Sequence, residues 1–338
     1  MTGRHAGGGP DGASMPAVEP GLAFVTVVFE PELPLLRLQA RSFRQHLAPD
    51  DVAELVVLDN CAGGMGRSAQ RAVLDELGEE LAARTAFVRT SALGVDGGTK
   101  GWRSQQAAKL LVARRLRSEH IVILDAKNHL IGAASAADFV GPDGRVHGAT
   151  HPYTEHPLRA DLERTLRYLG ADDARIASLL EAFPPTTTPF VIRTQDARRM
   201  LDDVELTSGR PFGEEFERAG LLEFFLYSGW CILRGSGMPV DGEPIRAPLV
   251  WPRKADERGA AEAIRDASDS GAAWFAVHRR ALARADGATT DRIVAFWVER
   301  GLMTAPEARR FVRRFRLGYI PAVGRARAAE RLSRLRSR

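Results

Sequence analysis

Residues 101–131 read GWRSQQAAKLLVARRLRSEHIVILDAKNHLI, and this stretch is the best guide to the fold. Its first half has a broad apolar face with basic residues opposite, Lys109 among them, which is the pattern of an amphipathic helix. Its second half is a continuous apolar run over 121–124, typical of a strand buried on both faces. Four polar residues follow within five positions: Asp125, Lys127, Asn128 and His129. Because ligands of open α/β sheets sit outside the carboxyl ends of strands, this cluster is the first candidate site.

The composition is that of an ordinary globular chain. Of its 338 residues, 44% are hydrophobic and 27% charged, which suits one large α/β domain with an appendage. No apolar run approaches the roughly 18 residues that a membrane-spanning helix needs. Residues 1–20 are rich in Gly and Pro and lack the apolar core of a signal peptide, so we expect a disordered tail. Cys61 and Cys231 form no disulfide framework or metal motif, which favours a reducing, cytoplasmic compartment.

The net charge of +4 is unevenly distributed. From Ala305 onward the chain carries eleven arginines against Glu307 and Glu330, so the rest of the chain is mildly acidic. Basic arms with interspersed apolar residues bind anionic membrane surfaces or acidic polymers, and a solvated tail is the alternative. No nucleic-acid motif is recognised in the chain, so we expect no nucleic-acid partner. The arm therefore suggests a peripheral position at the inner membrane face.

Apolar strands alternate with amphipathic helices through the first 131 residues, which predicts a mostly parallel sheet flanked by helices. Strands are expected at 22–29, 55–58, 86–88, 121–124, 190–192 and 274–277, with an extended segment at 229–233. Helices are expected at 35–47, 158–183, 196–204, 214–227, 260–267 and 293–298, and a glycine-rich loop at 91–101. We expect one domain over 21–285 and a helical C-terminal region over 286–338 that ends in the basic arm.

Acidic residues close the first, second and fourth of these strands. The first strand ends at Glu30, the second at Asp59 and the fourth at Asp125. Because parallel strands end at one edge of a sheet, Asp59 and Asp125 should share that edge. Asp59 suits a hydrogen bond to a nucleobase or ribose, although a turn-forming role is the alternative.

The carboxylate of Asp125 could serve as an oxygen ligand for a hard divalent cation. Lys127 would then pair with the negative charge of a phosphate, while Asn128 or His129 completes the coordination shell of the cation. The alternative is a strand end whose polar groups are merely solvated or cap the next turn.

Glu223 lies in the apolar run LLEFFLYSGW, residues 221–230. Burial there would raise the pKa of its carboxyl group and suit it to general-base catalysis. The alternative is a structural bond to the backbone or to an arginine such as Arg218 or Arg234.

Five segments resemble nucleotide-sugar glycosyltransferases of the GT-A fold. More closely, they are similar to a bacterial family of uncharacterised glycosyltransferase-like proteins found among polysaccharide-assembly genes. The resemblance covers about residues 22 to 278 and lies in FVTVVFEPELPLLRLQARSFRQHL (24–47), ELVVLDN (54–60), KLLVARRLRSEHIVILDAKNHLI (109–131), TPFVIRTQDARRMLDDVE (188–205) and EFFLYSGW (223–230).

The resemblance implies a Rossmann-related domain that transfers a sugar from a nucleotide diphosphate sugar to a glycan or lipid-linked acceptor. In GT-A enzymes an Asp-x-Asp motif holds Mn²⁺ or Mg²⁺ against the donor diphosphate. The first Asp matches Asp125, but the second position is Lys127. Either Asp125 binds a metal with Asn128, His129 or water, or Lys127 itself stabilises the departing nucleoside diphosphate.

The same resemblance implies roles for three further acids. Asp59 and Glu30 fall on the donor side, Asp59 at the base or ribose. Glu223 falls near the acceptor, as the catalytic base if the reaction inverts the sugar.

Two other classes stay open from the sequence. A sugar nucleotidyltransferase normally has a Gly-rich loop with Thr and Arg after the first strand. FEPELP (29–34) occupies that place here, which argues against this class. A catalytically silent scaffold in polysaccharide assembly is favoured by Lys127 in place of the second Asp.

Overall fold

The computed structural model describes residue 17 and residues 19–95 and 102–336, with only the backbone described at Pro20, at Trp102 and over 326–336. Most of the expected tail over 1–20 and the second half of the glycine-rich loop, 96–101, lie outside the described residues. The first strand begins at Glu19, inside the stretch expected to be a tail. Within the described part, no helix is both long and apolar enough to cross a membrane.

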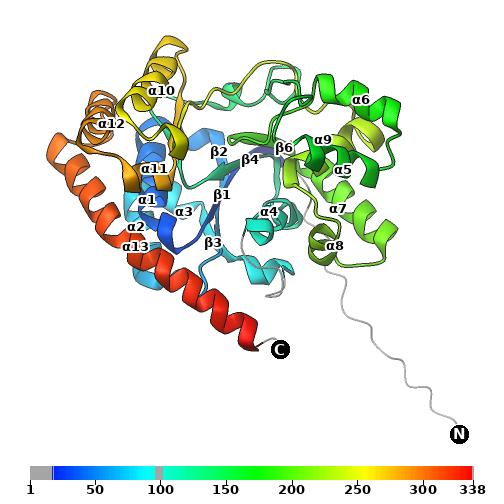
Figure 1. Cartoon of the computed structure of the whole chain (residues 1–338), viewed down its shortest axis with the longest axis horizontal. Helices are drawn as coiled ribbons and strands as arrows, with labels where there is room; N and C mark the ends of the chain where they lie inside the picture. The colour runs from blue at the N-terminus through cyan, green and yellow to red at the C-terminus, as the bar shows by residue number, and fades with distance from the viewer. Residues whose placement is uncertain (1–16, 18, 96–101, 337–338) are drawn as a thin grey trace, which may run out of the picture.

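A five-stranded sheet in the order β3-β2-β1-β4-β6 forms the centre of the molecule (Figure 1). β1 pairs in parallel with β2 and β4, β2 pairs in parallel with β3, and β6 is antiparallel to β4. The predicted mostly parallel sheet is confirmed. Its strands are β1 (Glu19–Val28), β2 (Val52–Asp59), β3 (Thr85–Arg89), β4 (Ser118–Asp125) and β6 (Phe190–Arg193).

Helices cover both faces of this sheet, because alternate residues of each strand point to opposite sides. Phe24 packs in a core with α1, α2 and the C-terminal helices, whereas Val25 packs in a second core with α4, α7 and α9. The helices are α1 (Leu33–His46), α2 (Arg67–Leu77), α3 (Glu79–Ala83), α4 (Trp102–Leu111), α5 (Arg159–Tyr168), α6 (Asp173–Glu181), α7 (Thr194–Ser208), α8 (Phe212–Arg218), α9 (Glu223–Arg234), α10 (Glu257–Asp269), α11 (Arg279–Arg284), α12 (Gly287–Glu299) and α13 (Ala305–Arg336). Short 3-10 turns are η1 (Glu30–Glu32), η2 (Pro49–Asp51), η3 (Thr90–Leu93), η4 (Val112–Arg114), η5 (Ala136–Asp138) and η6 (Pro252–Lys254).

A small second sheet continues from the end of β4. It has the order β5-β8-β7, with β5 (Asn128–Leu130) antiparallel and β7 (Leu249–Val250) parallel to β8 (Trp274–Val277). Only Ala126 and Lys127 separate β4 from β5. The second sheet therefore brings residues from beyond position 249 next to the carboxyl edge of the central sheet.

Two expected helices are each divided in the structure by a glycine with positive φ, a backbone conformation that ends helices. Gly170, at φ 89°, separates α5 from α6, and Gly220, at φ 65°, precedes α9. The segment 229–233 was expected to be extended but is helical, within α9. The continuous apolar run predicted a strand because this helix is buried on nearly all sides and lacks the polar face of an amphipathic helix.

The C-terminal region is helical, as predicted, and it packs on the body. Ala308, Val312 and Phe315 of α13 belong to the same apolar core as α1 and β1. The remainder of α13 continues along the edge of the molecule (Figure 1).

Candidate functional site

Asp59 and Asp125 lie at one edge of the central sheet, on either side of β1. Val28 is the register partner of Asp59, and Val27 is the register partner of Asp125. Since neighbouring strands are about 4.8 Å apart, the two backbones are separated by roughly 10 Å. The predicted shared edge is therefore present, with one strand between the two acids.

The carboxylate of Asp59 points into its own loop. Its Oδ1 accepts a hydrogen bond from the backbone N–H of Cys61 at 2.9 Å, and Oδ2 accepts one from Met65 at 2.6 Å. Arg89 adds an ion pair at 3.3 Å, and Asp59 is only 3% exposed. Glu30 holds the same loop by accepting a hydrogen bond from the N–H of Ala62 at 2.5 Å. The two predicted donor-side acids are thus both anchors of loop 60–65.

Each carboxylate oxygen of Asp125 faces a lysine. The ammonium nitrogen of Lys109 lies 2.8 Å from Oδ1, that of Lys127 contacts Oδ2, and the hydroxyl of Thr188 lies 3.2 Å from Oδ2. Burial alone would raise the pKa of Asp125, but the charges of Lys109 and Lys127 outweigh it and hold the pKa well below its usual range. Asp125 is therefore an ionised acid that already has two cations.

Asn128 is a buried support for this arrangement. It is 0% exposed; its Oδ1 accepts from the backbone N–H of Asp125 at 2.9 Å, and its Nδ2 donates to the carbonyl of Thr188 at 3.0 Å. Gln39 donates to the carbonyl oxygens of both Asp125 and Asn128. These bonds fix the turn that carries Lys127, so Asn128 acts by orienting its neighbours.

Lys109 was expected on the solvent side of its helix, and this interpretation is wrong. The residue is 6% exposed, and its ammonium nitrogen bridges Asp125 and Glu223, which is 3.4 Å away. It also lies 5.5 Å from the ring centre of Phe224, within cation–π range. Burial would lower the pKa of Lys109, but the two carboxylates raise it far above its ordinary value.

Glu223 opens α9 and is 8% exposed. Burial raises the pKa of its carboxyl group, and the opposing charge of Lys109 limits the rise. The arginines considered as partners bind elsewhere, because Arg218 pairs with Glu215 and Arg234 pairs with Asp203. The structure thus brings Glu223 and Asp125 together around one ammonium group.

A further charged pair at this edge was missed by the sequence reasoning. Glu32, 8% exposed, pairs with Arg279 at 2.5 Å, and the pKa of Glu32 is raised by burial against the effect of Arg279. Burial and neighbouring charges, including Lys127, lower the pKa of His278 to about 4. The exposed indole of Trp251 stacks on His278 with ring centres 6.2 Å apart. These residues come from two regions far apart in the sequence, so no local pattern could connect them.

His129 faces away from Asp125. It is 1% exposed, its Nε2 accepts a hydrogen bond from the indole N–H of Trp297 at 3.0 Å, and its ring packs edge-to-face on Phe275. Burial lowers the pKa of His129 to about 4. The expected pairing of Asp125 with His129 on a metal is therefore not formed. In β5, Asn128 bonds to the backbone of Asp125, and the next residue, His129, faces the opposite side.

The residues at Asp125 do not fit a divalent cation. A divalent cation would have to displace the ammonium groups that already contact both oxygens of Asp125, or bind beside their positive charge. Among the residues that the structure describes, no three His, Cys, Asp or Glu side chains are grouped to hold a metal ion.

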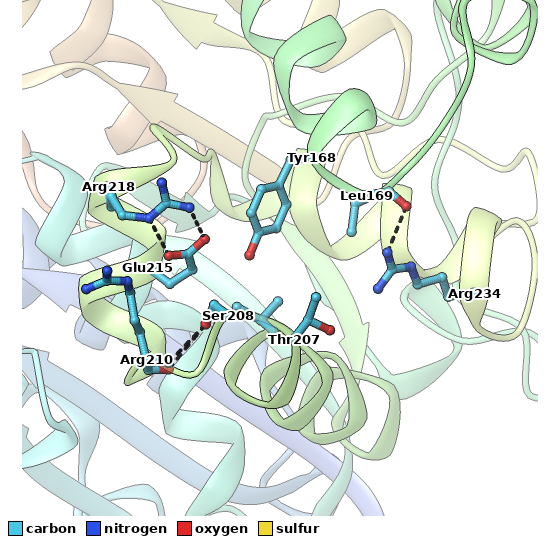
Figure 2. Close-up of a pocket in the computed structure, with 9 residues that line it drawn as sticks. Tyr168, Leu169, Thr207, Ser208, Arg210, Glu215, Arg218 and Arg234 are labelled. Atoms are coloured by element: carbon cyan, nitrogen blue, oxygen red, sulfur yellow. Dashed lines mark hydrogen bonds and ion pairs between the residues drawn. The ribbon is translucent and has the colours of Figure 1, made fainter.

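A separate hollow of about 420 Å³ lies among α5, α7, α8 and α9, and none of the expected site residues lines it. Figure 2 shows two of its bonds: Arg218 binds Glu215, and Arg234 donates to the carbonyl oxygen of Leu169. Burial, together with Glu215, raises the pKa of Tyr168 to about 12. The bond from Arg234 joins α9 to the end of α5, whereas the pairing of Arg218 with Glu215 lies within α8.

No protein-family model and no curated protein matches this chain. Among solved structures it is similar to the bifunctional glycosyltransferase WbbM in its apo form, with 10% identity, 90% of this chain covered and a TM-score of 0.48. The chain spans 53% of that WbbM chain, about half its length. It is also similar to the galactosyltransferase LgtC in complex with donor and acceptor sugar analogs, at 13% identity and a TM-score of 0.46, covering 82% of this chain and 99% of that one.

Proposed function

We propose that this chain is a glycosyltransferase that moves a sugar from a nucleotide diphosphate sugar to a hydroxyl group of a glycan or lipid-linked acceptor. One observation carries the proposal: at the carboxyl edge of the sheet, Lys109 joins Asp125 to Glu223, with Lys127 on the other side of Asp125. Such a site combines cations that suit a diphosphate with a carboxylate that suits a hydroxyl proton.

The charged groups divide into a donor side and an acceptor side. Lys127, whose side chain is 16% exposed, binds the donor diphosphate. Loop 60–65, held by Asp59 and Glu30, borders the nucleoside. Trp251, which is 51% exposed, offers an aromatic face to a sugar or base ring.

In the transfer, the acceptor oxygen forms a bond to the anomeric carbon, and the bond from that carbon to the phosphate oxygen breaks. The electron pair stays on the departing nucleoside diphosphate, whose negative charge Lys127 neutralises. Glu223, with its raised pKa and a side chain that is 11% exposed, accepts the hydroxyl proton.

The outward side of α13 supports a peripheral position at the cytoplasmic membrane face, where lipid-linked acceptors are found. Leu317 is 72% exposed and Ile320 is 77% exposed. A rotation of 100° per residue places Arg310, Arg313 and Arg314 on the same side of the helix. Exposed apolar residues framed by arginines are the pattern of helices that lie on anionic lipid surfaces.

Isothermal titration with UDP- and GDP-sugars, together with a radiolabelled sugar-transfer assay, tests the proposal. We expect one nucleotide sugar to bind, and its binding to be lost in Asp125→Ala but kept in Asp75→Ala, an acid on α2 whose side chain is 68% exposed. A chain that binds no nucleotide sugar is not a transferase. That outcome favours the scaffold role, which the engagement of both Asp125 oxygens by lysines would also suit.

A further inference from the structure

The charges around Asp125 are already balanced within the described part of the chain. Every carboxylate near it has a basic partner within 4 Å, so there is no surplus of negative charge to attract a divalent ion. The acids are Asp125, Glu223 and Glu32, and the bases are Lys109, Lys127 and Arg279.

The two lysines differ in exposure, and so in what they can reach. The side chain of Lys109 is 7% exposed and is held from three sides by Asp125, Glu223 and the ring of Phe224. Lys127 lies on the turn between β4 and β5, and its side chain keeps 16% of its surface open. Lys109 is therefore a fixed internal cation, whereas Lys127 is the cation that a ligand can contact.

The second position of the GT-A Asp-x-Asp motif is the place where Lys127 stands. At that position the ammonium group contacts Asp125 directly and supplies positive charge, where the motif would have a second acid to hold a metal ion. Lysine is a compact point charge that binds phosphate oxygens well. A charge supplied by a side chain is present without any ion being bound first.

We infer that this site binds and releases the diphosphate of its donor without a divalent cation, with Lys127 supplying the charge and Lys109 positioning Asp125 and Glu223. The inference rests on the proposed function. When the bond between the anomeric carbon and the phosphate oxygen breaks, the new charge on that oxygen is met by the ammonium group of Lys127. No metal ion takes part in the balance of charge.

The test uses the full chain and titrates UDP and GDP calorimetrically, once in EDTA and once in excess Mn²⁺. We expect whichever nucleotide binds to have the same Kd in both, within about twofold. Mn²⁺ added to the protein alone, followed by its electron paramagnetic resonance signal, should stay free. Nucleotide binding that disappears in EDTA, or a bound Mn²⁺ signal, overturns the inference while the proposed function stands.

Two substitutions at one position sharpen the result. Lys127→Met should weaken binding of the diphosphate about 10- to 100-fold and leave binding of the uncharged nucleoside unchanged. Lys127→Asp restores the second acid, and diphosphate binding should then become tighter on adding Mn²⁺. Lys254→Met is the matched control, since this lysine is 66% exposed and pairs only with Glu262 among the described residues.

The outcomes separate the two ideas. If neither nucleotide binds under either condition, the transferase proposal fails and the metal-free inference falls with it. If the nucleotide binds but Lys127→Met keeps full affinity for the diphosphate, only the inference fails.

Discussion

The ammonium nitrogen of Lys109 lies 3.4 Å from a carboxylate oxygen of Glu223, although 114 positions separate them in the chain. The same nitrogen lies 2.8 Å from Asp125, so one buried cation connects α4, β4 and the start of α9. A charge buried to this degree is tolerated because it is paired on both sides. This contact therefore joins the stability of the fold to the geometry of the candidate site.

Replacing Lys109 with methionine should destabilise the protein strongly, because it leaves Glu223 buried beside Asp125 without its cation. We expect the free energy of unfolding in urea to fall by roughly 3–5 kcal/mol. Adding Glu223→Gln to Lys109→Met should recover part of this loss, since the uncompensated charge is removed.

The exposed lysine of η6 is the control for that experiment. Lys254→Met should change the free energy of unfolding by less than about 0.5 kcal/mol. A loss below about 1 kcal/mol in Lys109→Met would show that the ammonium group contributes little and that the three elements are held by packing alone.

Asp125→Asn should change how stability depends on pH. The folded-state pKa of Asp125 lies far below its ordinary value, first because of Lys109 and then because of Lys127, which together outweigh burial. A lowered pKa contributes stability above the unfolded-state pKa, and this stability is lost as the pH falls below it. The variant should be less stable than the original at neutral pH, and the difference should shrink between about pH 5 and pH 3.

Chemical unfolding at a series of pH values measures this difference. Asp75→Asn, at an exposed site on α2, should show no such narrowing. A gap between Asp125→Asn and the original that stays constant down to about pH 3 would mean that Asp125 keeps an ordinary pKa.

The sheet and its acidic edge were predictable from the sequence because they depend on local patterns. Continuous apolar runs mark buried strands, and parallel strands must end at one edge, which placed Asp59 and Asp125 there. The role of each acid was not predictable in the same way. Asp59 accepts hydrogen bonds from the backbone N–H groups of Cys61 and Met65, two and six residues later. Nothing in the sequence of this loop identifies those N–H groups as partners of Asp59.

Lys109 and His129 were misplaced for opposite reasons. A lysine on a helix is ordinarily assigned to solvent, and only Asp125 and the distant Glu223 allow its burial. A histidine in a polar cluster suggests a ligand, but Trp297, 168 positions later, accounts for it as a core residue. The sequence did hold one signal for the burial of Lys109. Asp125 is an acid at the end of a fully buried strand, and such a group needs a cation nearby.

Asp59→Asn should loosen loop 60–65 without disturbing the rest of the sheet. An asparagine side chain has one acceptor oxygen, so the N–H of either Cys61 or Met65 loses its partner, at a cost of about 1–3 kcal/mol. Cys61 is 3% exposed, and its thiol should react with a thiol reagent roughly tenfold faster or more in the variant.

The labelling is best read in a Cys231→Ser background, so that only one thiol is present. Cys231 lies in α9, away from the loop. In a Cys61→Ser background, the labelling rate of Cys231 should be unaffected by Asp59→Asn. Equal labelling of Cys61 with and without the substitution would mean that the loop is held by other contacts, and Asp59 would then be available to a nucleoside.

The outward face of α13 should bind vesicles that contain anionic lipid, and this is measured by sedimentation. Replacing Leu317 and Ile320 together with serine should weaken binding roughly 10- to 100-fold, since two largely exposed apolar side chains no longer enter the lipid. Leu206→Ser is the matched control, because Leu206 is 85% exposed but lies on α7. Binding should also weaken with added salt, because the arginines act through charge. If the double variant and the control bind equally, α13 does not contact the lipid surface, and the acceptor must reach the site from solution.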